Sequence, residues 1–331
     1  MPIGLREILL RAKEYWEVQN PGQGGAEKWH FREYKTKPFC TPGFWAALSA
    51  LAKHHGVGPD GIVLPESLSG YSEAIGLSAA LWGQEKYLRQ RPSAGTNYSP
   101  IEHLVSSANT NDATNRINGC LEKLVGQFAG AEALLKELCN VVGEVHDNVW
   151  SHGCASGFSV AQRWRVPGDD AQFFLEFALA DCGVGFLDEL RRAQIRGIAD
   201  DQAAIRWCLQ KGTTTKGKGQ EDPWRQRVPE DVEKSPFSKG VGTYGSENWH
   251  QGLGLYRMAQ LIKQSQAELW IASGTALLYY SPSGERFQEL SDPWQGVALA
   301  CRFDTRKLSA ASPSGDLGRL VDAFRRSDHG G

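Results

Sequence analysis

The sequence lacks several features that would assign it to a class of protein at once. Its 331 residues contain no apolar run near the roughly 20 residues that a membrane-spanning helix needs. The formal net charge is only −2, so no excess of positive charge indicates nonspecific binding to nucleic acid. The N-terminal stretch MPIGLREILLRAKEYW is amphipathic rather than signal-like. We therefore expect a protein of the cytoplasm whose partners include neither a membrane nor a nucleic acid.

Cysteine is scarce and scattered. The seven cysteines include no C-x-x-C pair, a distribution that favours reduced thiols over disulfides or a zinc site. Cys182 is the only cysteine near the candidate chemistry described below. No neighbour in the sequence would lower the pKa of its thiol, so we expect a small, half-buried residue rather than a nucleophile.

The composition and the local patterns of the sequence indicate a folded α/β chain. Hydrophobic residues make up 41% of the sequence and charged residues 22%, which is typical of globular proteins, and the length allows two domains. We place a smaller α/β domain at residues 1–110. It has a helical pattern at 44–54, a short apolar strand at 62–64 and a helical region at 71–87 with a break at Gly76.

The boundary between the two domains is expected in a polar stretch. Residues 91–97 and 106–114 are rich in turn-forming side chains and indicate linkers. The second domain then covers residues 111–308, and residues 309–331 form a tail. No internal repeat or low-complexity tract interrupts this organisation.

The second domain alternates helical and strand patterns. The sequence PGDD at 167–170 is a hairpin signal, and a tight turn is expected at 273–274. Helices grouped with antiparallel hairpins predict a two-layer α/β sandwich with a mixed sheet. The expected helices are 115–128, 131–151, 186–194, 201–211 and 252–264, and the expected strands are 158–164, 172–180, 267–272, 276–281 and 296–303.

The most informative segment is 138–153, LCNVVGEVHDNVWSHG, in which apolar residues recur at helical spacing. Glu144 and Asn148 lie one turn apart on one face of this helix, and His152 follows one turn later. A carboxylate and a carboxamide stacked in this way can position a water and a hard divalent cation together. The plainer alternative is a pair of polar side chains that meet solvent.

Two glycine-containing turns follow. Residues 178–186, ALADCGVGF, are an apolar run that ends in Asp181 with Gly183 and Gly185 directly after it. Residues 250–258, HQGLGLYRM, place Gly252 and Gly254 at the start of an amphipathic helix. Each motif alone is common in proteins, and an Asp-Gly turn needs no ligand to explain it.

The order of these three motifs resembles that of the GHKL ATPase superfamily, which includes gyrase, mismatch-repair ATPases, histidine kinases and anti-sigma serine kinases. The resemblance covers roughly residues 132–306 and implies the Bergerat fold. It implies that Glu144 aligns or deprotonates the attacking group and that Asn148 binds Mg²⁺. His152 would approach the phosphates, although a histidine at a helix end is also stabilised by the helix dipole.

The resemblance also assigns the adenine contacts. Asp181 would accept a hydrogen bond from the exocyclic amine of adenine, which selects adenine over guanine. Gly183 and Gly185 would let the backbone approach the base and turn sharply. One departure concerns the family's Gly-Thr pair in a late strand, whose threonine helps to hold adenine. Its best match here is Gly296-Val297, so that hydroxyl is missing.

The phosphates would lie at the second glycine turn. The N–H groups of Gly252 and Gly254 at a helix N-terminus suit phosphate binding, and Leu255 is expected to anchor that helix to the core. Neither a strand–GxGxxG–helix unit at these glycines nor a Walker-type GK[ST] sequence is present. The roughly forty polar residues at 212–251 resemble an ATP lid. Lys216 could reach a phosphate, although a solvated lysine is the safer assumption.

Three functions are compatible with these observations. The leading hypothesis is an intracellular regulatory protein that binds ATP with Mg²⁺ and either hydrolyses it slowly or phosphorylates a protein partner. A helix–strand–helix pattern in residues 1–110 faintly resembles STAS-like partner domains. The alternatives are an orphan histidine-kinase-like protein, against which stands the lack of a phosphoacceptor motif, and a non-catalytic scaffold. The sequence leaves the oligomeric state open, a homodimer included.

Overall fold

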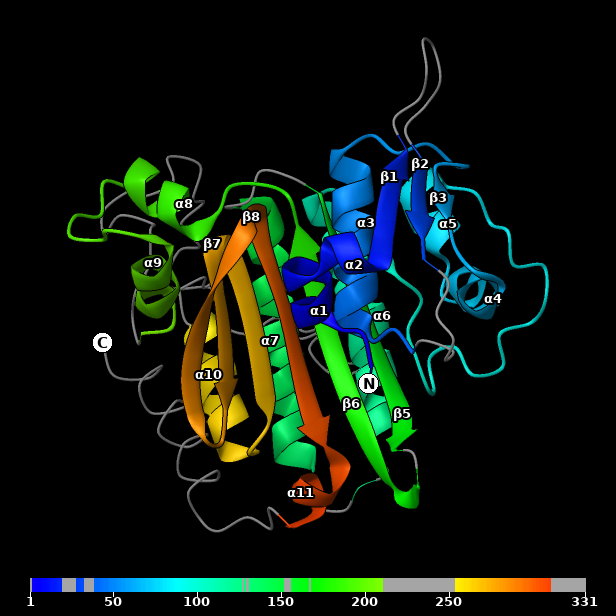
Figure 1. The fold of residues 1–331 in the computed structure, drawn as a ribbon. Helices are drawn as coiled ribbons and strands as arrows, with labels where there is room; N and C mark the ends of the chain where they lie inside the picture. The colour runs from blue at the N-terminus through cyan, green and yellow to red at the C-terminus, as the bar shows by residue number, and fades with distance from the viewer. Residues whose placement is uncertain are drawn as a thin grey trace, which may run out of the picture.

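The computed structural model describes residues 2–19, 28–32, 39–126, 128, 131–151, 156–166, 168–210 and 254–310. They form a mixed α/β fold (Figure 1). The helices are α1 (Leu5–Leu10), α2 (Ala12–Tyr15), α3 (Pro42–His54), α4 (Glu66–Ala74), α5 (Leu77–Trp82), α6 (Ser107–Val125), α7 (Glu132–Ser151), α8 (Phe186–Arg192), α9 (Asp201–Cys208), α10 (Gly254–Gln264) and α11 (Thr305–Ala310). The strands are β1 (Trp16–Gln19), β2 (Lys28–Phe31), β3 (Ile62–Val63), β4 (Glu102–Leu104), β5 (Gly157–Val166), β6 (Asp169–Asp181), β7 (Glu268–Ser281) and β8 (Gly284–Asp304).

A five-stranded sheet forms the centre of the molecule. Its order is β4-β5-β6-β8-β7, and every neighbouring pair is antiparallel. The expectation of a mixed sheet in this part of the chain was therefore wrong. The reason is that β5–β6 and β7–β8 are hairpins, and β8 returns against β6 in the opposite direction. The mixed sheet is instead the small one near the N-terminus, in which β2 pairs antiparallel with β1 and parallel with β3.

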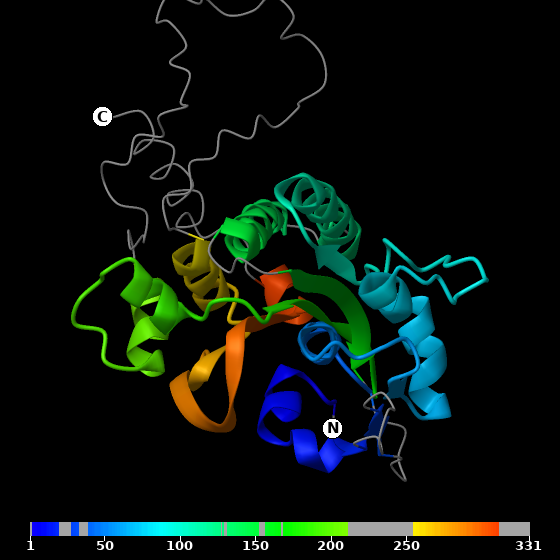
Figure 2. The ribbon, with the colours of Figure 1, turned by 90° about the horizontal axis from the view of Figure 1, so that it is seen from above.

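Both faces of the central sheet are buried. Successive side chains of a strand point to opposite faces, and those of β6 enter two different hydrophobic clusters. Ala178 and Ala180 join the cluster that contains α3, whereas Leu175, Phe177 and Leu179 join the cluster that contains α6, α7 and α10. Figure 2 shows the same arrangement, with α6 and α7 on one side of the sheet and the blue N-terminal helices on the other.

The N-terminal segment therefore adds a third layer to the expected two-layer sandwich. Helix α3 packs against β5 and β6, where small alanine side chains leave room for a close approach. A Cβ added at Gly43 would lie 3.2 Å from the Cβ of Ala300 and 2.8 Å from that of Leu5. The division into domains near residue 110 stays a prediction. The described contacts cross it, since β4 pairs with β5 and α3 shares a core with β6.

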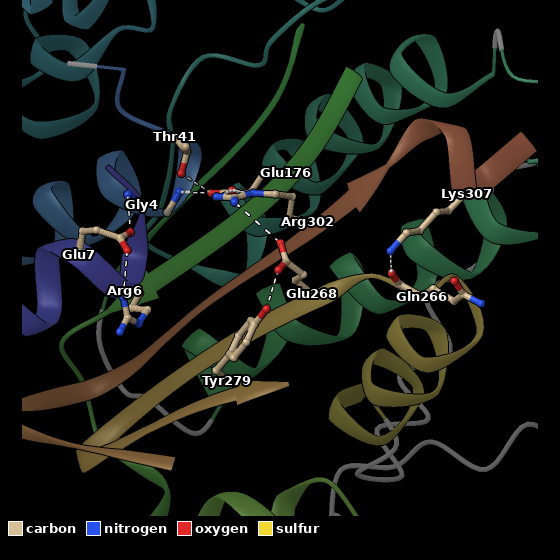
Figure 3. Close-up of polar contacts among 11 residues, drawn as sticks. Gly4, Arg6, Glu7, Thr41, Glu176, Gln266, Glu268, Tyr279, Arg302 and Lys307 are labelled. Atoms are coloured by element: carbon tan, nitrogen blue, oxygen red, sulfur yellow. Dashed lines mark hydrogen bonds and ion pairs between the residues drawn. The ribbon is translucent and has the colours of Figure 1, made fainter. Parts of the chain in front are cut away.

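A buried polar network fastens α3 to this face (Figure 3). The Glu176 carboxylate on β6 accepts hydrogen bonds from the Thr41 hydroxyl (2.7 Å) and the Gly43 amide (2.8 Å), at the N-terminus of α3. Its other oxygen, Oε2, accepts a hydrogen bond from Nε of Arg302 at 2.9 Å and forms an ion pair with Nη2 of the same guanidinium at 2.8 Å. Because unpaired N–H groups at a helix N-terminus favour a negative charge, Glu176 satisfies α3 and Arg302 together.

Two local expectations differ from the structure. Residues 106–114, expected as a linker, begin α6, with the Ser106 hydroxyl accepting a hydrogen bond from the Asn109 amide as a helix cap. Polar composition concealed this helix because its burial depends on a few positions, such as Thr110 and Ala113. The expected hairpin turn at 273–274 was also wrong. Gly274 has φ +58° inside β7, and register shifts on both sides make it a bulge.

Most of the remaining expected elements occur with small changes of boundary, but the strand expected at 296–303 is only the last part of β8, which begins at Gly284. The break at Gly76 separates α4 from α5, with Gly76 in the left-handed region at φ +77°. The strand expected at 62–64 is β3, and the helices expected at 131–151 and 252–264 are α7 and α10. Local sequence patterns did not predict α1, α2, β1, β2, β4 and α11.

Candidate functional site

Helix α7 carries the expected stripe of apolar residues. All five of its members are buried against the sheet and the neighbouring helices, and they are Leu138, Val141, Val142, Val145 and Val149. Glu144 and Asn148 lie outside this stripe and are partly buried. The long amphipathic pattern was sufficient to predict which face of this helix packs and which residues remain available.

Glu144 lies against the first turn of α10. Its Oε1 accepts a hydrogen bond from Nη1 of Arg257 at 2.6 Å. A Cβ added at Gly254 would stand 2.8 Å from Oε2 of Glu144 and 2.9 Å from its Cβ, so a larger residue could not occupy that position without a shift. Two of the predicted motifs, 110 residues apart in the sequence, are therefore in direct contact. In Figure 1, α10 lies beside α7.

The charge state of Glu144 depends on opposing influences. Burial raises the pKa of its carboxyl above the ordinary value, and the carboxylates of Glu137 and Asp147 act in the same direction. The guanidinium of Arg257 acts against them and favours the charged form. A half-buried carboxylate with a raised pKa is the kind of group that can accept a proton during catalysis.

Asp181 ends β6 and is almost wholly buried, with 4% of its surface exposed. Its Oδ1 accepts hydrogen bonds from the amides of Gly183 (2.9 Å) and Val297 (3.4 Å). Burial raises the pKa of Asp181 to about 7, against the effect of these two bonds. Among the described residues, none donates a hydrogen bond to Oδ2.

The glycine of the late strand is in contact with Asp181. Gly296 has φ +84°, a conformation that favours glycine, and lies in an irregular stretch of β8. A Cβ added there would meet the Asp181 carboxylate and would stand 2.6 Å from the Gly183 amide. The pair Gly296-Val297, which is the best match to the family's Gly-Thr pair, therefore lies beside Asp181. The isopropyl group of Val297 replaces the hydroxyl, while its backbone amide still bonds to Asp181.

The second glycine of the D-x-G-x-G turn connects this corner to β7. Gly185 caps the N-terminus of α8, and a Cβ added to it would stand 2.8 Å from the Ser273 hydroxyl. That hydroxyl accepts a hydrogen bond from the Phe186 amide at 3.0 Å. Ser273 therefore fixes the end of the turn. This role of Ser273 was not predictable from the sequence, because a serine in a strand carries no local signal of it.

The last turn of α7 connects the two corners. Gly157 is the β5 partner of Asp181 in the sheet, and a Cβ added to it would stand 2.8 Å from a methyl carbon of Val149. Asn148 is the residue before Val149 and lies one turn after Glu144. The corner around Asp181 and the contact between Glu144 and Gly254 are therefore arranged along one helix. Among the described residues, no direct contact between Asp181 and Glu144 is recorded.

Other predicted residues have definite places or lie outside the description. Leu255 packs against the cluster that contains α7 and α10, so its expected anchoring role is confirmed. His152, Lys216, Gly252 and the proposed lid at 212–251 lie outside the described residues. Cys182 is half-buried, and burial raises the pKa of its thiol to about 12, which does not suit a nucleophile.

His146, also on α7, is a packing residue and not part of the site. It is fully buried, with its ring nitrogens 2.8 Å from the hydroxyls of Thr114 and Ser159. Burial lowers the pKa of this histidine to about 3, so it stays neutral and joins α6, α7 and β5.

Arg257 is a residue of the candidate site that the sequence did not indicate. It lies one turn after Gly254 on α10, close to the face that buries Met258, Leu261 and Ile262. An arginine beside an apolar face requires a partner, and this could have indicated that a carboxylate lies opposite. Which carboxylate it is depends on how α10 meets α7, and local spacing does not contain that information.

Comparisons with models of protein families, with curated proteins and with solved structures found no match to this chain. Among the described residues, no helix has both the length and the apolar character that crossing a bilayer demands. The same part of the chain holds no group of three or more histidine, cysteine, aspartate or glutamate side chains arranged for a metal ion. Mg²⁺ bound together with a triphosphate needs only one or two protein ligands.

Proposed function

We propose that this chain is an ATP-binding regulatory protein of the GHKL type, which holds Mg·ATP between α7, the turn after β6 and the N-terminus of α10. One observation supports the proposal: residues from motifs that are far apart in the sequence contact one another in the fold. Gly254 lies against Glu144, and Gly296-Val297 lies against Asp181. The same residue types could occur in any chain, but these contacts arise only when the motifs fold together.

The roles of the residues follow from their chemistry. Asp181 is buried and uses only Oδ1 for hydrogen bonds among the described residues, so Oδ2 would accept the adenine amine. The Asn148 amide oxygen would be the protein ligand of Mg²⁺, and Gly254 would offer its N–H at the start of α10 to a phosphate. Glu144 would take the proton of the attacking water or hydroxyl as the bond between the γ-phosphorus and the bridging oxygen breaks.

Binding is the first test. Titration calorimetry of the full chain with Mg·ATP and with Mg·GTP should show binding of ATP and at least tenfold weaker binding of GTP, because a guanine 6-oxo group would face the Asp181 carboxylate. Asp181→Asn should weaken ATP binding. Asp188→Asn is the matched control, because Asp188 lies in an exposed ion pair with Arg191 on α8. If the wild type binds no ATP, the non-catalytic scaffold is the correct reading.

Turnover is the second test. Glu144→Gln should lower turnover about 10²- to 10⁴-fold and leave ATP binding intact, as expected when a general base is lost. With γ-labelled ATP, free labelled phosphate indicates an ATPase and label on an added protein indicates a kinase. Acid-labile, base-stable label on the chain itself would favour the histidine-kinase-like alternative. Equal turnover in Glu144→Gln and wild type would contradict the role given to Glu144.

The first part of the chain is proposed to connect this site to a partner. Its STAS-like resemblance remains a prediction, as does the identity of the phosphoacceptor. The contact of α3 with β6, the strand that ends in Asp181, offers a physical route between the two parts. A partner that binds the N-terminal segment should therefore change the affinity for ATP, and ATP should change the affinity for that partner by the same factor.

A further inference from the structure

Arg257 stands between two carboxylates of α7. Its Nη1 lies 2.6 Å from Oε1 of Glu144, and its Nε lies 4.0 Å from Oε1 of Glu137, two turns earlier on the same helix. The three side chains are similarly shielded, with 23% of Arg257, 27% of Glu144 and 23% of Glu137 exposed. In such partial burial an ion pair is screened less than at the surface, so the guanidinium of Arg257 stabilises the charged form of Glu144.

The two carboxylate oxygens of Glu144 have different surroundings. Oε1 is occupied by Arg257, whereas Oε2 faces Gly254, where the missing side chain leaves space. Among the described residues, no hydrogen bond to Oε2 is recorded. One oxygen is thus held while the other is directed toward the N-terminus of α10, the place that the proposed function gives to the phosphates.

The charged groups around Glu144 would otherwise favour its neutral form. Glu137 and Asp147 come from α7 itself, and Arg257 comes from α10, which packs against it. Two like charges and partial burial oppose ionisation of Glu144, and the guanidinium is the one named group that supports it. Without that support, less of the carboxylate form would be present near neutral pH.

We propose that Arg257 is a positioning residue for the phosphoryl-transfer step. It orients Glu144 through Oε1, and its positive charge stabilises the carboxylate whose Oε2 lies beside the α10 N-terminus. This inference rests on the proposed function and adds a residue to it. Arg257 does not touch the reacting atoms in this arrangement. It acts through Glu144, so its removal should change the protonation of the base more than the affinity for the nucleotide.

The variants Arg257→Met and Arg257→Lys separate charge from packing. Methionine keeps much of the aliphatic length and removes the charge, whereas lysine keeps the charge without the planar fork. For Arg257→Met we expect turnover at pH 7 to fall about tenfold or more, with the Kd for Mg·ATP changed by less than about threefold. The acidic limb of its pH–rate profile should move upward by about one pH unit, because an opposite charge no longer lowers the pKa of Glu144.

Two comparisons sharpen the result. Arg257→Lys should return the acidic limb most of the way to its wild-type position. Glu137→Gln removes a like charge near Glu144 and should move the limb in the opposite direction, to lower pH. Arg206→Met provides the control for loss of an arginine from an ion pair elsewhere, since Arg206 pairs with Glu285 at 3.2 Å, and it should leave the profile unchanged.

A purely structural role predicts a different outcome. If Arg257 only joins α7 to α10, Arg257→Met should lower the stability to denaturant while the pH–rate profile of the folded protein keeps its position. An unmoved acidic limb in Arg257→Met would therefore overturn the proposal, even if turnover falls.

The titration of Glu144 can also be followed without turnover. Carboxyl-labelled glutamate gives a ¹³C resonance for Glu144, assigned by its loss in Glu144→Gln, whose pKa should rise by about one unit in Arg257→Met. An unchanged pKa would refute the inference. If the wild type binds no ATP, the proposed function fails, whereas this titration still decides whether Arg257 sets the charge state of Glu144.

Discussion

Two glutamate–arginine pairs lie on opposite faces of the same sheet, and they differ in what their carboxylates have left to do. Glu176, on the face covered by α3, has 1% of its side chain exposed, and both oxygens are occupied by Thr41, Gly43 and Arg302. Glu144, on the α10 side, is 27% exposed and is held through Oε1.

The difference separates a carboxylate that builds the fold from one that is available for chemistry. A buried charge is tolerated when every lone pair has a donor, and Glu176 meets this condition. Glu144 has fewer donors and more solvent, so it contributes less to stability, and its Oε2 accepts no hydrogen bond from the described residues. In the sequence alone the two pairs cannot be distinguished, because each consists of an acidic residue and a basic residue far along the chain.

Breaking the α3 pair should give the largest effect. Glu176→Ala leaves Arg302, the Thr41 hydroxyl and the Gly43 amide without their acceptor in a dry interior. We expect it to lower the free energy of unfolding by about 3–5 kcal/mol, measured by chemical denaturation. Glu144→Ala should cost about 1 kcal/mol or less because its pair is partly solvated. Equal losses in the two variants would contradict the distinction drawn between the pairs.

The next effect concerns the turn beside Asp181. Gly296→Ala puts a Cβ against the Asp181 carboxylate at φ +84° and should cost about 1–3 kcal/mol in stability through crowding and backbone strain. ATP affinity should fall as well, since Asp181 must move. Gly168→Ala is the matched control. Gly168 has φ +85°, and a Cβ there would meet no other described atom within 4 Å. If both variants lose the same stability, strain alone explains the loss.

The pH dependence of ATP affinity should reveal Asp181. Burial raises its pKa to about 7, and the adenine amine needs the ionised carboxylate as an acceptor. Protons therefore compete with ATP below pH 7, and the Kd should rise by about tenfold for each unit of pH lost there. Above pH 7 the affinity should be level. Calorimetry of Asp181→Asn provides the contrast, since its weaker binding should not vary with pH through this group.

The same ionisation acts on stability with a defined sign. The folded-state pKa of Asp181 is raised above that of the unfolded chain, so the folded protein binds more protons between about pH 4 and 7. Ionisation of Asp181 therefore lowers the free energy of unfolding progressively as the pH rises through that window. The variant Asp181→Asn should lack this part of the pH dependence of stability. A wild-type curve that is as flat as that of the variant would argue against a raised pKa.

The smallest effect should come from an exposed pair. Nη1 of Arg191 and Oδ1 of Asp188 are 3.1 Å apart on α8, and 63% and 73% of the two side chains are exposed. Arg191→Ala should change the unfolding free energy by less than about 0.5 kcal/mol, because solvent screens the pair. This variant sets the lower end of the scale on which the Glu176 and Glu144 pairs are compared. A loss above about 1 kcal/mol would mean that exposure is a poor guide to ion-pair strength in this protein.

Local patterns were sufficient for one side of the molecule. The stripe of α7 and the turn after Asp181 are encoded within short windows, so their helix, strand end and glycines were predictable. The α3 layer was not, because it depends on alanines of β6 and β8 meeting a helix more than a hundred residues away. The bulge at Gly274 resembles a hairpin turn in sequence, and only pairing with β8 distinguishes the two. Arg257 was missed for the same reason, since its partner belongs to another helix.

Because α3 covers one face of the sheet, the choice of protein fragment matters for measurements of nucleotide binding. A fragment starting near residue 111 would uncover the alanine-lined surface of β6 and β8, leave Glu176 and Arg302 facing water or a foreign chain, and strip β5 of its neighbour β4. An open strand edge beside a bared apolar surface invites self-association. Weak or irreproducible ATP binding by such a fragment would therefore reflect a disrupted fold rather than the properties of the site. ATP binding should be measured on the full chain.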